Sequence, residues 1–154
     1  MNIVYDNDLL DQKAYFELFL TTGWNKEYVL GPEELFRSIQ DSWYMVCAWH
    51  GRSLVGFGRI ISDGVLHALI VDMMVRPNHQ GKGISTAVLQ RLLQRCESAE
   101  IRDVQLFCAK GKAGFCEKQG FRERSSDAPG MELPSWPRGK AIGAAQGAYL
   151  QPRP

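Results

Sequence analysis

The sequence has little of several features that mark specialised classes of protein. Its 154 residues carry a formal net charge of +1, so charge gives no reason to expect binding to nucleic acid or to an anionic membrane. No apolar run approaches the roughly 20 residues that span a bilayer. The first residues lack the basic start, apolar middle and cleavage site of a signal peptide. We therefore expect a cytoplasmic protein without nucleic-acid or membrane partners.

Cysteine and histidine are also scarce and scattered. The four cysteines include no CxxC pair, and the three histidines do not lie at zinc-ligand spacing from them. Cys47 and Cys108 fall inside apolar runs, where a buried thiol acts as a small hydrophobic side chain. These patterns predict no metal site and a reducing compartment.

What is present is a mixture of helical and extended patterns. Apolar spacing predicts helices over about 9–20, 83–98 and 113–119. Gly31-Pro32-Glu33-Glu34, with proline in a first turn and acids at the positive end of the dipole, signals a further helix that stops near Asp41. Alternating or aromatic-rich stretches predict strands over 3–5, 43–49, 54–61, 65–75, 104–109 and 121–124, of which those within 43–75 form an antiparallel meander. The length suits one domain over 1–154, in which the Pro- and Gly-rich stretch 125–154 is an irregular tail.

The most informative segment is the strand, tight turn and helix between Val71 and Thr86. The turn contains Gly81 and Gly83, which let a backbone approach a ligand without a Cβ in the way. Such a turn presents unpaired N–H groups at the positive end of a helix, and Lys82 adds a cation. The segment therefore predicts a phosphate or diphosphate site.

Two nucleotide-binding motifs fit this turn poorly. A Walker A loop needs a glycine where Arg76 stands. The Rossmann fingerprint needs a third glycine where Thr86 stands, within a parallel βαβ unit rather than after a meander. A glycine-rich turn that binds nothing is the remaining structural alternative.

Two patterns resemble a known family. Val75-x-Pro77-x-x-Gln80-x-x-Gly83-x-Ser85 resembles the acetyl-CoA signature of the GNAT superfamily of N-acetyltransferases, and the stretch 113–121 is similar to that family's second pattern, Ala-x-x-Phe-Tyr-x-x-x-Gly-Phe. The resemblance covers about residues 2–124 in element order. It implies an α+β (mixed α/β) fold with a central twisted mixed sheet of about six or seven strands, flanked by about four helices. The fourth and fifth strands would splay apart.

The resemblance implies how acetyl-CoA would bind as a co-substrate. The pantetheine arm would lie in the splayed gap against the fourth strand, and an N–H near Met74 would stabilise the oxyanion. Ser85 departs from the family's Gly or Ala but remains small. The implied cofactor residues are the strand edge and the diphosphate turn: Met73, Met74, Val75, Gln80, Gly81, Lys82, Gly83, Ile84 and Ser85.

The activity implied is direct transfer of an acetyl group to a primary amine in a ternary complex. Asp72 is our candidate for the base that deprotonates the amine, because a carboxylate inside an apolar strand is unusual. An acid that anchors a neighbouring loop explains Asp72 equally well. Cys116 stands where the family commonly has a Tyr that protonates the leaving thiolate. Either the Cys116 thiol replaces that donor, or the thiolate leaves unassisted, which we prefer slightly.

The acceptor is expected to be a small-molecule amine bound near the early helices. Trp24 and Tyr28 would supply aromatic contacts and Asp63 an ionic one, although core packing also explains aromatic residues, and Asp63-Gly64 is readily explained as a turn. A protein or peptide acceptor stays open, as does a non-catalytic acyl-CoA-binding or sensing module. A homodimer is a further possibility common among such domains.

Overall fold

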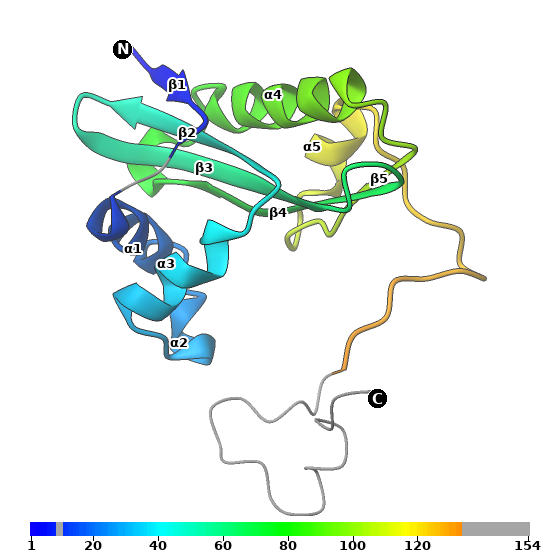
Figure 1. Ribbon diagram of the computed structural model, residues 1–154, viewed down its shortest axis with the longest axis horizontal. Helices are drawn as coiled ribbons and strands as arrows, with labels where there is room; N and C mark the ends of the chain where they lie inside the picture. The colour runs from blue at the N-terminus through cyan, green and yellow to red at the C-terminus, as the bar shows by residue number, and fades with distance from the viewer. Residues whose placement is uncertain (9–10, 134–154) are drawn as a thin grey trace, which may run out of the picture.

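The computed structural model describes residues 1–8 and 11–133, and its five strands form one sheet in chain order (Figure 1). Neighbours from the first strand to the fourth pair antiparallel, and the fifth pairs parallel with the fourth. The strands are β1 (Val4–Asp6), β2 (Tyr44–His50), β3 (Ser53–Ser62), β4 (His67–Val75) and β5 (Asp103–Leu106).

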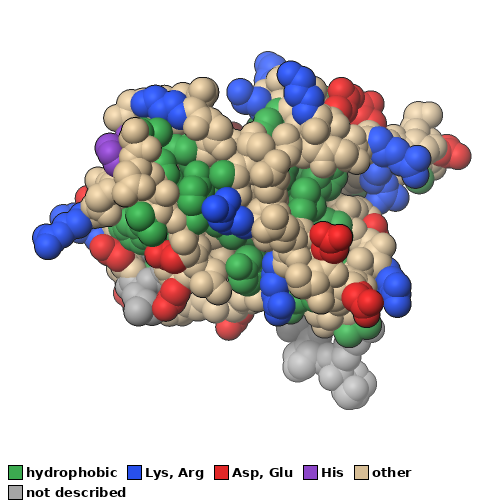
Figure 2. Space-filling view, turned by 90° about the horizontal axis from the view of Figure 1, so that it is seen from above, with side chains coloured by type: hydrophobic (Ala, Val, Ile, Leu, Met, Phe, Trp, Pro, Cys, Tyr) green, Lys and Arg blue, Asp and Glu red, His purple; other side chains and the backbone are tan. Residues whose placement is uncertain are grey.

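The helices lie in two layers, one on each face of the sheet. Figure 1 shows α1, α2 and α3 on one face and α4 and α5 on the other. The bounds are α1 (Gln12–Leu20), α2 (Asn25–Tyr28), α3 (Pro32–Gln40), α4 (Ile84–Ser98) and α5 (Ala113–Lys118), with a 3-10 turn η1 (Pro77–His79) before α4. On the face that carries α4, basic and acidic side chains are interspersed (Figure 2).

Local sequence explains where the helices begin. The Asp11 carboxylate accepts the N–H of Ala14 at 2.9 Å and caps α1. In α3, Pro32 occupies the first turn, and the Glu34 carboxylate accepts the N–H of Gly31 at 3.2 Å. None of the helices in the described ranges has the length and apolar composition needed to cross a membrane.

Each face of the sheet has its own apolar core. Side chains of α1 and α3 pack with Phe57 and Met74 on one face, whereas side chains of α4 pack with Ile60 and Ile70 on the other. Met74 and Ile70 are both residues of β4, and an even number of positions along a strand normally keeps side chains on one face. Their opposite orientation therefore requires an irregularity between them.

That irregularity is a β-bulge at Asp72. Phe57 of β3 pairs with Met74 of β4, but Arg59, two residues later, pairs with Val71, which is three residues earlier. Between these pairs β4 therefore contains one residue more than β3. Asp72 has φ +56°, in the left-handed region that Asp tolerates better than most residues. The extra residue reverses the alternation of side chains along β4. Even-numbered residues therefore face α4 before the bulge, as Ile70 does, and face α1 after it, as Met74 does.

Gly58 makes room for this bulge. A Cβ at Gly58 would lie 2.6 Å from the Met73 sulfur, 2.9 Å from Val88 and 3.1 Å from Leu92. We expect Gly58→Ala to lower the free energy of unfolding by about 1–3 kcal/mol through overpacking. Gly114→Ala is the matched control, because a Cβ there meets nothing within 4 Å. Chemical denaturation tests this, and equal stability of the two variants would contradict the packing argument.

The predicted architecture is confirmed, and one strand is wrong. Residues 121–124 form no strand, so the described sheet has five strands rather than six or seven. The helix α2 was not predicted. The expected tail is described only as far as Leu133, where 125–133 contain no helix or strand; 134–154 lie outside the described residues.

Candidate acetyl-CoA site

The turn before α4 presents a row of unpaired backbone donors. The first N–H of this helix with a backbone acceptor is that of Ala87, which donates to the Gly83 carbonyl at 3.0 Å. Within the described part of the chain, the N–H groups of residues 81–86 have no acceptor. Free N–H groups at a helix N-terminus attract anions through their partial positive charge. The turn therefore presents a partial positive charge and free N–H donors to whatever lies beside it.

The two glycines of the turn leave this row of donors accessible. Gly81 has φ +71° and Gly83 has φ +79°, conformations that strain any L side chain. A Cβ at either position would meet nothing within 4 Å, so the space beside the turn is open. A ligand can therefore approach the backbone directly.

Polar side chains tie this turn to the end of β4. The Gln80 amide donates from Nε2 to the Val75 carbonyl at 3.1 Å, and the Lys82 ammonium donates to the Asn78 carbonyl at 2.8 Å. The hydrogen bond to Asn78 keeps the Lys82 ammonium beside the turn. Because Lys82 is exposed, an anion can reach it there. Both contacts fix the turn without using its N–H groups.

The gap between β4 and β5 opens beside this turn. Pairing with β5 covers only His67–Ile70 of β4, opposite Asp103–Leu106. From Val71 to Val75, β4 has no strand partner on its β5 side within the described sheet. The predicted splay of the fourth and fifth strands is thus present, and it leaves one edge of β4 free.

The pairing of β4 with β3 sets the direction of the N–H groups near Met74. The N–H of Arg76 donates to the Val55 carbonyl of β3 at 2.8 Å. Because N–H directions alternate along a strand, the N–H of Met74 also faces β3, whereas those of Met73 and Val75 face the gap. The two strand N–H groups that face the gap are thus those of the immediate neighbours of Met74. The Met74 side chain, 3% exposed, belongs to the core.

Asp72 lies on the α1 face of the sheet and is held by Arg59. The Arg59 Nε donates to Asp72 Oδ2 at 2.5 Å, and Arg59 also reaches the Ser42 hydroxyl at 3.4 Å. The Asp72 side chain is 25% exposed, and no contact occupies its second oxygen, Oδ1, in the part of the chain described. Burial and the Asp72 charge raise the pKa of the neighbouring Tyr15 phenol. Asp72 is thus a fixed, partly accessible carboxylate beside the bulge.

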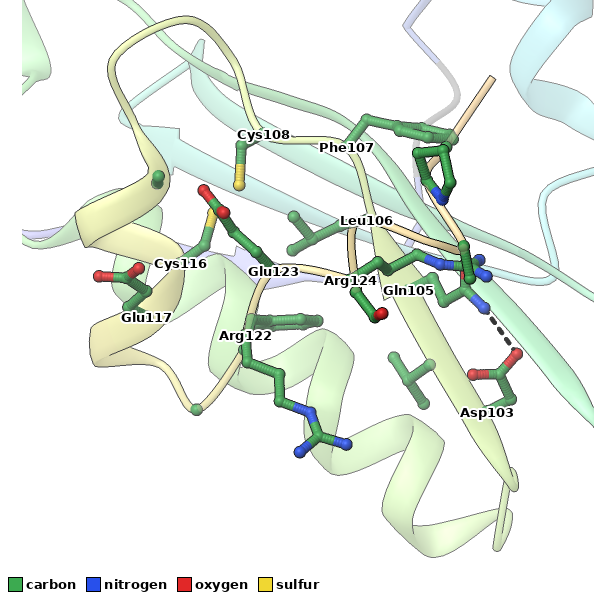
Figure 3. A pocket seen from close by; sticks show the side chains of 18 of the residues that line it. Asp103, Gln105, Leu106, Phe107, Cys108, Cys116, Glu117, Arg122, Glu123 and Arg124 are labelled. Carbon is green, nitrogen blue, oxygen red and sulfur yellow. Dashed lines mark hydrogen bonds between the residues drawn. The ribbon is translucent and has the colours of Figure 1, made fainter. Parts of the chain in front are cut away.

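Cys116 lines a groove on the outer side of β5. The groove has a volume of about 1160 Å³ and lies between β5, α5 and residues 120–130 (Figure 3). Cys116 is 6% exposed, and burial together with a hydrogen bond to Cys108 raises the pKa of its thiol to about 11. The thiol is therefore protonated at neutral pH and has a proton to donate.

The residues expected to bind the acceptor do not lie together. Trp24 and Tyr28 flank the Phe19 ring at centroid distances of 5.9 and 6.4 Å and are 37% and 52% exposed. Asp63 closes the β3–β4 turn, where its Oδ1 accepts the N–H groups of residues 65–67. These hydrogen bonds lower the pKa of its carboxyl group. The structure therefore places Asp63 at the opposite end of β4 from Val75, about 25 Å away at 3.3 Å per residue.

A family model described as "Acetyltransferase (GNAT) family" matches residues 12–121, which contain the turn, the bulge and the splayed gap. The chain belongs to this family. The match includes both sequence patterns that carried the resemblance. It ends at Phe121, three residues after α5, the last helix in the described residues.

Individual relatives agree with this family. An uncharacterised N-acetyltransferase, ycf52, from Pyropia yezoensis is 36% identical over 51% of this chain and 45% of its own length. Serotonin N-acetyltransferase 2, chloroplastic, from Oryza sativa subsp. japonica is 28% identical over 73% of this chain and 56% of its own. The chain thus spans about half the length of these curated relatives. The fold also matches glucosamine-6-phosphate N-acetyltransferase from Arabidopsis thaliana, with a TM-score of 0.66 and 17% identity over 88% of this chain and 99% of the other.

The roles of two residues of this site were not predicted from the sequence. Arg59 follows Gly58 in β3 and was not linked to Asp72, because only the fold brings the two strands into register. Cys108 was interpreted as a buried thiol, yet it is exposed beside Cys116. The predicted strand 104–109 continues past the end of β5 at Leu106, because the apolar residues 106–109 gave no sign that pairing with β4 stops there.

Proposed function

We propose that this chain is an N-acetyltransferase that moves the acetyl group of acetyl-CoA to a primary amine by direct attack in a ternary complex. The observation that supports this most strongly is the row of unpaired N–H groups at 81–86 beside the free edge of β4. The N–H groups suit the diphosphate of coenzyme A, and the free edge of β4 suits its amide-containing pantetheine arm. Membership of the GNAT family supports the same activity.

Acetyl-CoA would supply an activated thioester, and the residues of the chain would hold and polarise it. The N–H groups of residues 81–86 and the Lys82 ammonium suit the charge of the diphosphate. The N–H of Val75, which faces the gap, suits the oxygen that becomes negative when the amine attacks. The Val75 carbonyl already accepts from Gln80, so the turn and the proposed oxyanion donor are fixed to one another.

The amine must lose a proton, and we propose Asp72 as the acceptor of that proton, directly or through a water molecule. Arg59 holds Oδ2, and the Asp72 side chain stays 25% exposed. Asp72 is the residue before Met73, at the start of the strand edge that we assign to the thioester, which supports this role. The ion pair equally supports a purely anchoring role for Asp72, and the variants Asp72→Asn and Arg59→Gln separate the two roles.

The Cys116 thiol is the proposed position for a proton donor, with unassisted departure of the thiolate as the alternative. We expect Cys116→Tyr to leave or raise kcat, because the phenol is a better hydrogen-bond donor and the adjacent groove has room for a ring. Steady-state rates of the two proteins test this. A fall of more than about tenfold, with an unchanged circular dichroism spectrum, would mean that the thiol itself takes part.

For the acceptor, we propose a small primary amine. The named relatives that act on serotonin and glucosamine-6-phosphate support a small-molecule acceptor. Trp24 and Tyr28 remain the proposed aromatic contacts, because they are exposed on the face of the sheet that carries Asp72. A protein or peptide acceptor is the second candidate; a relative named histone acetyltransferase TAP1, from Glycine max, favours it.

A screen of amines separates catalysis from mere binding. The full chain is mixed with acetyl-CoA and a panel of aryl-alkyl amines, amino sugars and lysine peptides, and the release of free coenzyme A thiol is followed. We expect amine-dependent release well above the rate of acetyl-CoA hydrolysis. Tight acetyl-CoA binding without release for any amine would instead support the non-catalytic acyl-CoA-binding module.

A further inference from the structure

The cysteines differ sharply in their surroundings. Cys47 and Cys96 are 0% and 3% exposed and belong to the two cores on opposite faces of the sheet. Cys108, by contrast, is exposed just after β5, and Cys116 lies in α5 at the wall of the same groove. Of the four free thiols, these two alone lie beside one another.

The two sulfurs of this pair are directed toward each other. Figure 3 shows the Cys108 side chain pointing from the loop after β5 toward α5 and the Cys116 side chain pointing back toward it. Cys108 also contributes to the raised pKa of the Cys116 thiol, as a neighbouring thiol does. A disulfide forms only between cysteines whose side chains are directed at one another, as these two are. The connecting loop contains Gly111, at φ +75° in open space, and its residues 109–112 are exposed.

We propose that Cys108 and Cys116 are a redox-active dithiol that a low-molecular-weight disulfide such as glutathione disulfide converts into an intramolecular disulfide. In the first step the Cys108 thiolate attacks one sulfur of glutathione disulfide, forms a mixed disulfide and releases one glutathione thiolate, which takes up a proton. In the second step the Cys116 thiolate attacks the Cys108 sulfur and releases the second glutathione. Two protein thiols are oxidised and one glutathione disulfide is reduced to two thiols.

The order of these steps follows from exposure. Cys108 is open to solvent, so an external disulfide can reach it. Cys116 is 6% exposed, and burial raises the pKa of its thiol to about 11, so little of it is thiolate at neutral pH. Cys116 is therefore the resolving cysteine, which reacts only with the sulfur already beside it. The resulting bond would tie the end of β5 to α5 along one wall of the groove.

This chemistry can be tested without any measurement of acetyl transfer. The reduced full chain is incubated with glutathione disulfide, and its intact mass and its thiols after denaturation are measured. We expect the loss of two of the four thiols, a mass lower by two hydrogens without bound glutathione, and a cross-linked Cys108–Cys116 peptide. Wild-type protein that keeps all its thiols, retains one glutathione, or forms disulfide-linked dimers would overturn the proposal.

Three variants assign the roles. Cys116→Ser should trap one glutathione on Cys108, and Cys108→Ser should react at least tenfold more slowly than wild type. Cys96→Ser is the matched control, because Cys96 is as buried as Cys116 but lies in the α4 core, and it should form the disulfide as wild type does. Equal oxidation of the Cys108→Ser protein would overturn the assignment of Cys108 as the attacking thiol. The wild-type mass measurement decides the proposal even if a variant does not fold.

Discussion

Replacing Gly83 by glutamate is expected to abolish acetyl-CoA binding while the protein stays folded. Gly83 lies at φ +79° with open space around its Cα, so a side chain there would project into the region assigned to the diphosphate. A carboxylate at this point would also repel the phosphates and compete for the N–H groups of residues 84–86. We expect the Kd for acetyl-CoA to rise at least about 100-fold, which corresponds to about 2.7 kcal/mol. Isothermal titration calorimetry measures it.

Gly23→Glu is the matched control for this substitution. Gly23 has φ +77° and equally open surroundings, but it lies after α1, on the other face of the sheet. Both variants carry the same backbone strain of about 1–2 kcal/mol, and their melting temperatures should fall by similar amounts. Unchanged acetyl-CoA affinity in the Gly83→Glu protein would remove the turn from the site, whatever the control shows.

Replacing Asp72 by asparagine is expected to lower kcat at least about tenfold, as loss of a general base does. Asparagine tolerates the φ of +56° at this position as well as aspartate does, so the bulge should survive. Its amide cannot accept a proton from the attacking amine. The loss should therefore appear in kcat, whereas the Kd for acetyl-CoA stays unchanged. Initial rates at saturating acetyl-CoA, together with the Kd from calorimetry, provide the measurement.

Arg59→Gln separates a base from an anchor. This variant leaves the Asp72 carboxylate in place but removes the guanidinium that holds Oδ2. If Asp72 is the base, Arg59→Gln keeps more of kcat than Asp72→Asn does, because its carboxylate can still take the proton. If the ion pair merely fixes the bulge, both variants lose the same activity. A normal rate for Asp72→Asn would exclude both roles.

Local signals in the sequence were sufficient for most of the fold. Gly31-Pro32-Glu33-Glu34 identified the start of α3, because proline and acids at a helix start act within one turn. Residues 121–124 were wrongly predicted as a strand. A strand forms only against a partner, and after Phe121 this stretch is three exposed charged residues. The four-residue α2, which ends at Val29 in a left-handed conformation, carries too short a pattern to be recognised.

The candidate site was predictable only in part, for a similar reason. The turn containing Gly81 and Gly83 is local, and it could be identified from a few adjacent residues. The direction of each N–H along β4 depends on pairing with β3, and the bulge that reverses the alternation depends on Gly58 from the other strand. The sequence therefore indicated only that an oxyanion donor would lie near Met74, whereas the pairing with β3 turns the N–H groups of its two neighbours toward the gap.

We propose above all that the turn and the strand edge present acetyl-CoA to an amine. The most direct measurement is transfer of radiolabel from acetyl-labelled acetyl-CoA to the amine that gives the fastest thiol release in the screen, with wild type and Gly83→Glu compared under identical conditions. We expect labelled N-acetylated product in proportion to released coenzyme A with wild type, and none above background with the variant. Label that appears only as free acetate with wild type, or equal product from both proteins, would contradict it.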